Sequence, residues 1–423
     1  MQQKDFKSAM QKGLGRCVLA CRNDPERYRY AVLWGCAHSL AYDPQCEGTR
    51  AWLLYQLICC YTDRTPFVDV LMHTLQSRRT HGWLLLQTEE LLLLMANDGD
   101  ETAKAALWNK YGEMLSRLRA RRKPDLLDDY VFLSITLCGK TKNALRIAAD
   151  MGRLLREQPA YDAEDFGQFL WHVSANRQTT ALRQFAKTNA DATFFLRVYD
   201  AAAEQAARPL SEEQQTRVSG YHIAHDADED AFRLHAEQYQ KEPDPGKRAK
   251  LLNAFKWDRP FPLDPEPILQ DAQSENAQLR VCAWDALSLL RHPKVRAFAL
   301  SHADETPGDL VPVLITNYTK DDRPLLEQLF TTIPDNAEGA DTIHAIGMYI
   351  DRRRDPKFPV PAWILLRLYE TDPCSFCREA IVRALGRRRL LTDELLEELT
   401  YDANNQIRAY AEKKKTLRKV RHD

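Results

Sequence analysis

The chain has 423 residues, with 59 Lys and Arg against 60 Asp and Glu, so its formal net charge is −1 at pH 7. This balance argues against indiscriminate nucleic-acid binding by the whole surface, although it allows a local basic strip. A single hydrophobic core is unusual at this length, and no apolar run reaches the roughly 20 residues of a membrane-spanning helix. The 10 cysteines and an N-terminus without a signal-peptide pattern favour a reduced, cytoplasmic protein.

The N-terminal part reads as one helix after another. Apolar residues recur at spacings of three and four through residues 1–255, with no strand-like alternation. A turn at Asp43-Pro44 separates two of these helices, and Arg50 follows seven residues after Asp43. Four prolines then fall between Pro260 and Pro267, where a helix cannot continue. We therefore predict an N-terminal array over 1–255, a Pro-rich joint over 256–267 and a C-terminal array over 268–423.

Three C-terminal segments share one pattern. An apolar helix is followed by an Asp or Ser at a turn, by an Arg six residues later, and by alanines on an apolar face. The turn residue can accept hydrogen bonds from the opening N–H groups of the second helix, and the Arg can reach back over the turn. The residue pairs are Ser274 with Arg280, Asp372 with Arg378, and Asp402 with Arg408.

This pattern resembles the HEAT repeat over residues 265–290, 361–389 and 392–418. The last segment departs from the pattern at Lys413–Lys415, as a polar terminal cap would. The spacing leaves room for two further units at 293–318 and 323–352, with Leu310 and Thr342 near the Arg positions. The resemblance, which extends to bacterial HEAT-repeat proteins without an assigned activity, implies an all-α superhelix of stacked antiparallel helix pairs. Asp43 and Arg50 then form another such pair of turn residue and Arg, with a spacing of seven residues instead of six.

Several clusters admit a functional and a structural interpretation. Cys36, His38, Cys46 and Arg50 could serve an enzyme as nucleophile and base. We favour the structural alternative, in which Asp43 caps a helix and Arg50 bonds over the turn. Cys374 and Cys377 form a CxxC at a helix start, but no second CxxC completes a zinc site, so we interpret them as structural.

Two further polar clusters are interpreted as structural. The acidic stretch with His222 and His225 is read as a solvated loop rather than a metal site; its carboxylates are Asp226, Asp228 and Asp230. The group at 171–177 (Trp171, His172, Asn176 and Arg177) is read as a helix end whose side chains satisfy terminal carbonyls. No catalytic residue, cofactor or metal ion is predicted.

Basic residues concentrate towards the C-terminus and could form a strip for phosphates or for an acidic partner. The candidates are Arg352, Arg353, Arg354, Arg387, Arg388, Arg389, Lys413, Lys414 and Lys415. We favour solvated helix ends, because acidic residues are interleaved with them and few aromatic residues accompany them.

The leading functional hypothesis is a non-enzymatic solenoid scaffold or adaptor that binds a protein or peptide along its curved surface. The alternative is a nucleic-acid-binding protein. The HEAT resemblance implies this because some such solenoids grip DNA backbones and one family removes alkylated bases. A third alternative is an enzyme that uses Cys36, His38, Cys46 and Arg50, which we call the 34–50 cluster. Neither a membrane association nor a cofactor is expected.

Overall fold

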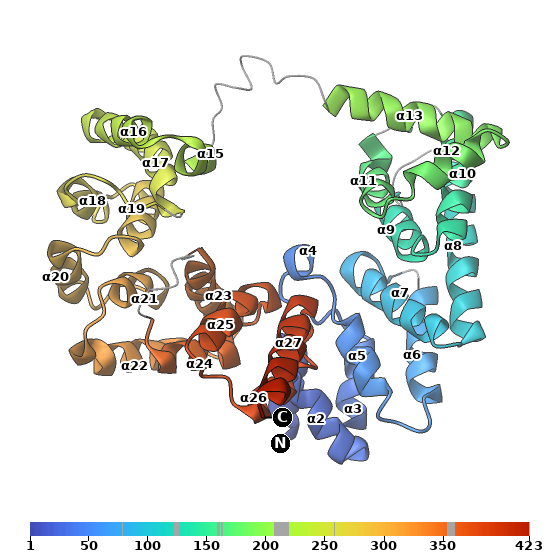
Figure 1. Ribbon diagram of the computed structural model, residues 1–423, viewed down its shortest axis with the longest axis horizontal. Helices are drawn as coiled ribbons and strands as arrows, with labels where there is room; N and C mark the ends of the chain where they lie inside the picture. The colour runs from blue at the N-terminus through green and yellow to red at the C-terminus, as the bar shows by residue number, and fades with distance from the viewer. Residues whose placement is uncertain are drawn as a thin grey trace. The chain divides into compact units, whose positions relative to one another are not determined.

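The computed structural model describes residues 1–77, 79–121, 127–158, 161, 164–206, 220–257, 259–352 and 360–422 (Figure 1). Every regular element in these ranges is helical, and none of the described residues forms a strand. This confirms the prediction of an all-α chain. Within the same ranges, no helix combines the length and apolar character needed to cross a bilayer.

The chain divides into two compact units. The first comprises residues 1–209 together with 398–408, and the second comprises 210–397 together with 409–423. The predicted Pro-rich joint at 256–267 lies inside the second unit, where the elements on either side of it contact each other. Apolar packing between neighbouring helices therefore continues across the prolines.

The first unit is built from thirteen helices and one 3-10 helix among the described residues. These elements are α1 (Gln3–Lys12), α2 (Arg16–Asn23), α3 (Pro25–Cys36), α4 (Pro44–Glu47), α5 (Ala51–Ile58), α6 (Thr65–Gln76), α7 (Gly82–Asn97), α8 (Glu101–Arg121), α9 (Leu127–Leu137), α10 (Thr141–Glu157), η1 (Glu164–Phe166), α11 (Gly167–Ala175), α12 (Thr179–Ala186) and α13 (Ala190–Ala206). The first unit also includes residues 398–408, which run from the end of α26 (Asp393–Leu399) to the start of α27 (Asn405–His422). Most contacts join near neighbours in the chain: α5 packs on α7, α7 on α8 and α9, and α10 on α13.

The second unit has the same kind of organisation. Its elements are α15 (Gly220–Asp226), α16 (Glu229–Lys241), α17 (Pro245–Leu252), η2 (Asn253–Lys256), α18 (Glu266–Asp271), α19 (Ala277–Ser288), α20 (Pro293–Ser301), α21 (Pro307–Thr316), η3 (Lys320–Asp322), α22 (Arg323–Thr332), α23 (Ala337–Arg352), α24 (Ala362–Thr371), α25 (Ser375–Arg387), α26 (Asp393–Leu399) and α27 (Asn405–His422). Helices α17, α19, α21, α23 and α25 contact one another in that order, and α18, α20, α22 and α24 pack beside them.

Many helices begin with a polar cap followed by proline. Asp24 and Asp244 each accept a hydrogen bond from the N–H three residues later, and a proline follows each of them directly. Proline suits this position because its fixed φ fits a helix and its missing N–H would have had no partner inside the helix. These X-Pro pairs therefore mark in the sequence where helices start.

The three turn–Arg pairs share one geometry. Each turn residue accepts a hydrogen bond from the N–H two residues later, and the helix begins one residue after that, so the N-cap itself lies two residues beyond the predicted position. The Arg donates to the carbonyl six residues earlier: Arg280 to Ser274 at 2.8 Å, Arg378 to Asp372 at 3.4 Å and Arg408 to Asp402 at 2.7 Å.

Within the first unit, residues 398–408 contact Gly13, α2 and α5. The N–H of Ala403 donates to the carbonyl of Gly13 at 2.8 Å. Arg16 and Glu398 form an ion pair at 2.8 Å, and the guanidinium of Arg408 lies over the ring of Trp52 at 3.6 Å. This packing joins residues that no local sequence pattern links.

Candidate functional sites

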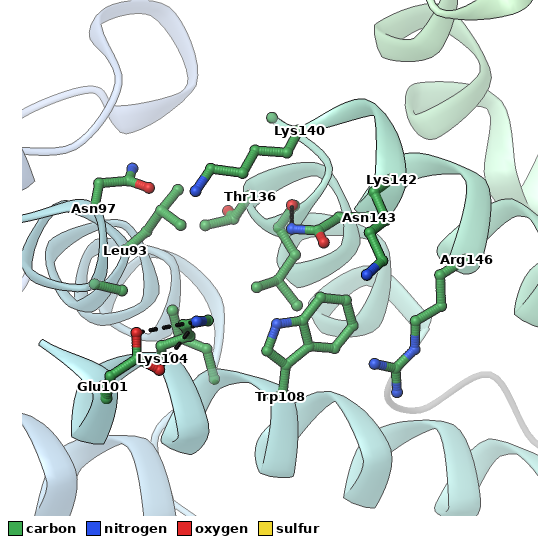
Figure 2. A pocket seen from close by; sticks show the side chains of 14 residues that line it. Leu93, Asn97, Glu101, Lys104, Trp108, Thr136, Lys140, Lys142, Asn143 and Arg146 are labelled. Carbon is green, nitrogen blue, oxygen red and sulfur yellow. Dashed lines mark hydrogen bonds and ion pairs between the residues drawn. The ribbon is translucent and has the colours of Figure 1, made fainter. Parts of the chain in front are cut away.

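A cavity of about 650 Å³ opens in the first unit where the ends of α7 and α9 meet the starts of α8 and α10. Leu93, Leu107 and Leu137 form the apolar part of its lining, called its floor below. Trp108 projects into it from α8 (Figure 2). Four basic side chains line it against a single acidic one, Glu101. They are Lys104, Lys140, Lys142 and Arg146.

The charges of this basic cavity are only partly neutralised from within. Lys104 pairs with Glu101 at 3.0 Å. The guanidinium of Arg146 lies 4.2 Å from the centre of the Trp108 ring, and its Nε is 3.9 Å from Asp150. Lys140 and Lys142 are exposed at the start of α10, where the N-cap residue, Lys140, provides no side-chain hydrogen bond to the helix. The positive end of the helix dipole thus adds to the field of the side chains.

The sequence analysis did not identify this basic cavity. Its cations lie on two helices that are separated by α9, and each alone looks like an ordinary solvated residue. The available signal was local: Lys140, Lys142 and Arg146 surround the uncapped start of one helix, and Trp108 is amphipathic and lies on a neighbouring helix. Only the packing of α8 beside α10 brings these features together.

A second cavity, of about 380 Å³, lies in the second unit among α19, α21 and α23. Its charged lining is acidic throughout: Asp285, Asp309, Glu338 and Asp341. An anionic ligand would be repelled there, so the two cavities differ in the charge of the ligand that each could accept.

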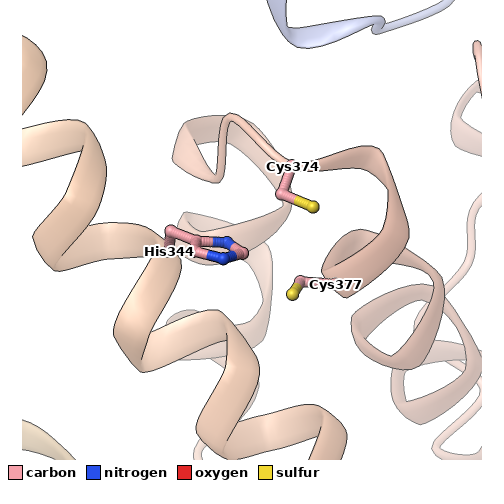
Figure 3. Close-up of side chains that lie close together, drawn as sticks. All are labelled: His344, Cys374 and Cys377. Carbon is pink, nitrogen blue, oxygen red and sulfur yellow. The ribbon is translucent and has the colours of Figure 1, made fainter. Parts of the chain in front are cut away.

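A thiol–imidazole cluster lies in the second unit between α23 and α25. The Sγ atoms of Cys374 and Cys377 and a ring nitrogen of His344 all lie within 4.8 Å of one another, and Figure 3 shows the imidazole pointing towards both sulfur atoms. Both cysteines are buried and unoxidised, and His344 is half-buried. The predicted CxxC is thus completed by a histidine from the preceding helix pair, which sequence reasoning missed.

Asp372 lies next to this cluster and interacts with two of its members, Cys374 and His344. Its Oδ1 accepts a hydrogen bond from the N–H of Cys374 at 2.9 Å and lies 3.9 Å from Nδ1 of His344. Interaction with Asp372, and then with Cys374, raises the pKa of His344 to about 10. Burial raises the pKa of Asp372, although His344 opposes this shift. At Gly347 a Cβ atom would lie only 1.9 Å from Oδ2 of Asp372, so glycine there makes room for the carboxylate.

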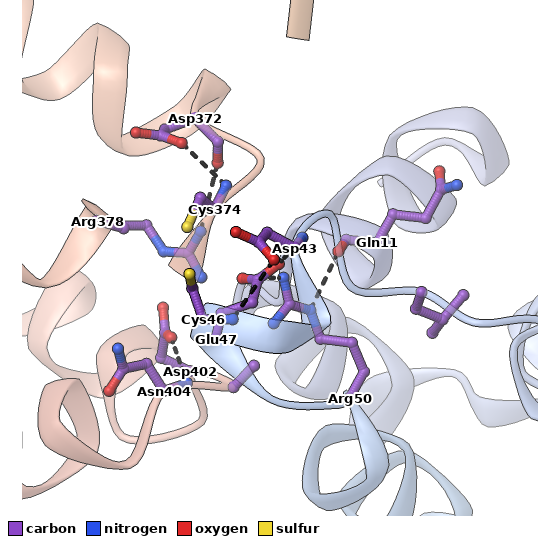
Figure 4. Close-up of polar contacts among 12 residues, drawn as sticks. Gln11, Asp43, Cys46, Glu47, Arg50, Asp372, Cys374, Arg378, Asp402 and Asn404 are labelled. Atoms are coloured by element: carbon purple, nitrogen blue, oxygen red, sulfur yellow. Dashed lines mark hydrogen bonds and ion pairs between the residues drawn. The ribbon is translucent and has the colours of Figure 1, made fainter. Parts of the chain in front are cut away.

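The contacts found at Asp43 in the 34–50 cluster are those of a helix turn. Asp43 accepts from the N–H of Cys46 at 3.4 Å, and Glu47 accepts from the N–H of Asp43 at 2.9 Å. Arg50 is fully buried; it pairs with Glu47 at 2.7 Å and donates to the carbonyl of Gln11 at 3.2 Å (Figure 4). Glu47, a member of the same polar cluster in the sequence, is therefore a carboxylate that holds Arg50.

Cys36 is buried, Cys46 is exposed, and His38 contacts Trp34. Burial raises the pKa of Cys36 to about 12, which keeps it a poor nucleophile. His38 stacks on Trp34 with ring centres 4.3 Å apart, and its Nδ1 lies 2.7 Å from the Trp34 carbonyl oxygen.

The two remaining polar clusters also have local roles. Asn176 donates to the carbonyl of His172 at 2.9 Å, while Trp171 is 72% exposed. In the acidic stretch, Asp228 caps α16 by accepting from the N–H of Ala231 at 2.8 Å. Asp226 and Asp230 lie on either side of it, with His225 in α15, and the side chain of His222 lies outside the described residues.

Two residues of the predicted basic strip, Lys415 and Arg388, make intramolecular contacts. Lys415 pairs with Glu397, Arg388 donates to the Val360 carbonyl, and Arg389 has a positive φ of 61° at the end of α25. Arg353, Arg354 and the side chain of Arg352 lie outside the described residues. Arg387, Lys413 and Lys414 lie at the ends of α25 and in α27.

Comparison of the chain with protein-family models, with curated proteins and with solved structures finds no match in any of the three. What the chain does must therefore be inferred from the chemistry of its own residues.

Proposed function

We propose that the protein is a HEAT-like α-solenoid whose role is binding rather than catalysis, and that it holds an acidic segment of a partner protein in the basic cavity. The observation that carries this proposal is the convergence of four cations, an uncapped helix N-terminus and Trp108 on one cavity of about 650 Å³. A peptide is the fitting occupant because the cavity offers both an apolar floor and a charged rim.

The order of helix contacts supports the solenoid part of the proposal. In the second unit, α17, α19, α21, α23 and α25 contact one another in succession, as stacked repeats do when each one buries the apolar face of the next. The turn–Arg geometry recurs at Arg280, Arg378 and Arg408, in three segments that the sequence assigns to separate repeats.

The charges of the cavity favour carboxylates as ligands. With four cations and one acid in the lining, the surplus is three positive charges. Arg146 and Trp108 already lie against each other, which holds the guanidinium in place and reduces the entropy lost when it pairs with an anion. A partner segment with acidic side chains around one apolar residue would therefore match both the rim and the floor.

A nucleic acid fits these cations less well. A phosphate backbone needs cations along an extended track, whereas Lys104, Lys140, Lys142 and Arg146 surround one cavity. The basic residues nearer the C-terminus would have to provide the track, and Lys415 and Arg388 are already bound to Glu397 and to the Val360 carbonyl.

The proposal is tested with a short fluorescent Glu-rich peptide that contains one central leucine, by anisotropy at several salt concentrations. We expect saturable binding that weakens as salt rises, and a loss of about tenfold in affinity, or about 1.4 kcal/mol, for Lys140→Glu and for Arg146→Glu.

The matched control is Lys187→Glu, which reverses an exposed charge in the same unit at the end of α12, outside the cavity lining. It should bind as the unaltered protein does. Binding that Lys140→Glu and Lys187→Glu weaken equally would contradict the proposal. Preference for single-stranded DNA over the peptide, with a steep salt dependence, would favour the nucleic-acid alternative instead.

A further inference from the structure

We propose that His344, Cys374 and Cys377 form a zinc-binding site, with two thiolates, one imidazole and a fourth position open to solvent. This site is independent of the basic cavity, which lies in the other unit. The ligand atoms already lie within 4.8 Å of one another on two packed helices, α23 and α25.

The chemistry of the donors selects the metal. Two thiolates and an imidazole are the ligands that Zn²⁺ prefers, whereas Mg²⁺ and Ca²⁺ need oxygen ligands. Tetrahedral zinc with bonds of about 2.0–2.3 Å places its ligand atoms roughly 3.3–3.8 Å apart. The ligand atoms lie up to 4.8 Å apart, so zinc binding requires them to approach one another by about 1–1.5 Å.

A carboxylate stands behind the ligands, as it does in many zinc sites. Asp372 is fully buried, and its Oδ1 lies 3.9 Å from Nδ1 of His344, a separation that has to shorten to a hydrogen bond for the carboxylate to orient the ring. Its Oδ2 accepts no hydrogen bond from any residue within the described ranges. The negative charge of this buried carboxylate would stabilise the positive charge of a zinc ion bound beside it.

The fourth position follows from burial. The side chain of His344 is 17% exposed, whereas both thiols are buried, so solvent reaches the cluster from the imidazole side. A water molecule can complete a tetrahedron there. Loading with Zn²⁺ displaces the two thiol protons, and the imidazolium proton where His344 is charged, and releases them to solvent. No bond other than these S–H and N–H bonds is broken.

The test uses the full chain, reduced and stripped of metal with a chelator, then supplied with Zn²⁺ alone. Zinc that remains bound after gel filtration is measured by elemental analysis, and affinity by competition with a chromogenic chelator. We expect about one zinc per chain and a higher melting temperature with zinc than without, because a metal that binds only the folded state stabilises it.

Substitutions distinguish the three proposed zinc ligands from neighbouring residues that do not bind the metal. The double variant Cys374→Ser with Cys377→Ser should lose the bound zinc, and His344→Gln should lower the affinity by more than a hundredfold. Asp372→Asn, which alters only the supporting carboxylate, should lower it by about 10–100-fold. Cys282→Ser is the control, because Cys282 is a buried thiol in the same unit that contacts Asn253 instead of this cluster.

A spectroscopic measurement keeps the test decisive if a variant fails to fold. Co²⁺ added to the unaltered, zinc-free protein should give sulfur-to-cobalt charge-transfer absorption and the visible bands of a tetrahedral ion, and Zn²⁺ should abolish both. The proposal is overturned if these bands do not form, if the double cysteine variant retains as much zinc as the unaltered protein, or if Cys282→Ser loses zinc to the same extent.

Discussion

The backbone N–H of Ala403 donates a 2.8 Å hydrogen bond to the carbonyl of Gly13, which joins the two ends of the chain within one unit. Gly13 has a φ of +77°, and an added Cβ would lie 2.6 Å from that of Ala403. At Gly15 the approach is closer still, because a Cβ there would lie 2.0 Å from the carbonyl oxygen of Glu398. Two glycines thus allow backbone segments from opposite ends of the sequence to meet.

The first prediction concerns Gly15→Ala. The added methyl group must push the Glu398 carbonyl away, so we expect the free energy of unfolding to fall by about 1–3 kcal/mol, measured by urea denaturation. The control is Gly112→Ala in the middle of α8, where a Cβ meets no atom within 4 Å. Alanine is the better helix former, so the control should gain about 0.5–1 kcal/mol. Equal effects of the two changes would show that the contact at Glu398 contributes nothing to stability.

The second prediction ranks the arginines of the turn–Arg pairs. Arg378 is fully buried, whereas Arg280 is partly exposed, although each donates to the carbonyl six residues earlier. Arg378→Ala leaves a cavity and an unsatisfied carbonyl, so we expect a loss of about 3–4 kcal/mol. Water can replace the Arg280 guanidinium, and Arg280→Ala should cost only about 1 kcal/mol. An unchanged melting temperature for Arg378→Ala would refute its role in the scaffold.

The helices could be predicted from the sequence because their signals are local. Spacing of apolar residues, X-Pro starts and the turn–Arg pairs lie within a few residues of one another, so the sequence reveals the all-α chain directly. The contact between Gly13 and Ala403 could not be predicted, since nothing in either segment encodes its partner. The two glycines beside Leu14 hint at a close approach without saying what approaches.

The thiol–imidazole cluster shows the same limit. Cys374 and Cys377 were visible as a CxxC, but the sequence offered only a second CxxC as a test for a metal, and none exists. His344 comes from the preceding helix pair, and its position depends on how α23 packs on α25. Gly347, three residues on from His344, carried the available signal, because a glycine inside a helix indicates a close neighbour.

The third prediction concerns the buried carboxylate of Glu89 on α7. Neither of its oxygens has a hydrogen-bond partner among the described residues, and its pKa is raised well above the ordinary value, first by burial and then by Asp129. Glu90 adds to this shift and Lys110 on α8 opposes it. The folded protein therefore keeps a proton that the unfolded chain releases above about pH 4.3, so stability falls as pH rises from there towards the folded pKa.

Glu89→Gln removes this dependence, because the amide stays neutral at every pH. At about pH 4 we expect the variant and the unaltered protein to have similar free energies of unfolding. At about pH 8 we expect the variant to be more stable by about 1–3 kcal/mol, because the unaltered protein must then either bury the charged carboxylate of Glu89 or take up a proton on folding. Urea denaturation across this range measures the difference. The exposed Glu113 of α8 provides the control, and Glu113→Gln should not reproduce the gain in stability at about pH 8. A constant difference between Glu89→Gln and the unaltered protein at all pH values would contradict the assignment.

The fourth prediction concerns Asp271, the last residue of α18, which joins three helices. It accepts hydrogen bonds from the hydroxyl of Tyr239 at 2.7 Å and from Nη2 of Arg248 at 2.7 Å, and its side chain is 11% exposed. Asp271→Asn leaves the Arg248 cation, only 18% exposed, without its counter-charge, so we expect a loss of about 2–4 kcal/mol in the free energy of unfolding. Tyr239→Phe removes one neutral donor and should cost about 1 kcal/mol.

A double-mutant cycle tests the ion pair itself. Arg248→Met should cost less in the Asp271→Asn background than in the unaltered protein, because in that background the substitution removes a buried cation that has already lost its counter-charge. If the two costs are equal, the pair formed by Arg248 and Asp271 makes no net contribution to stability.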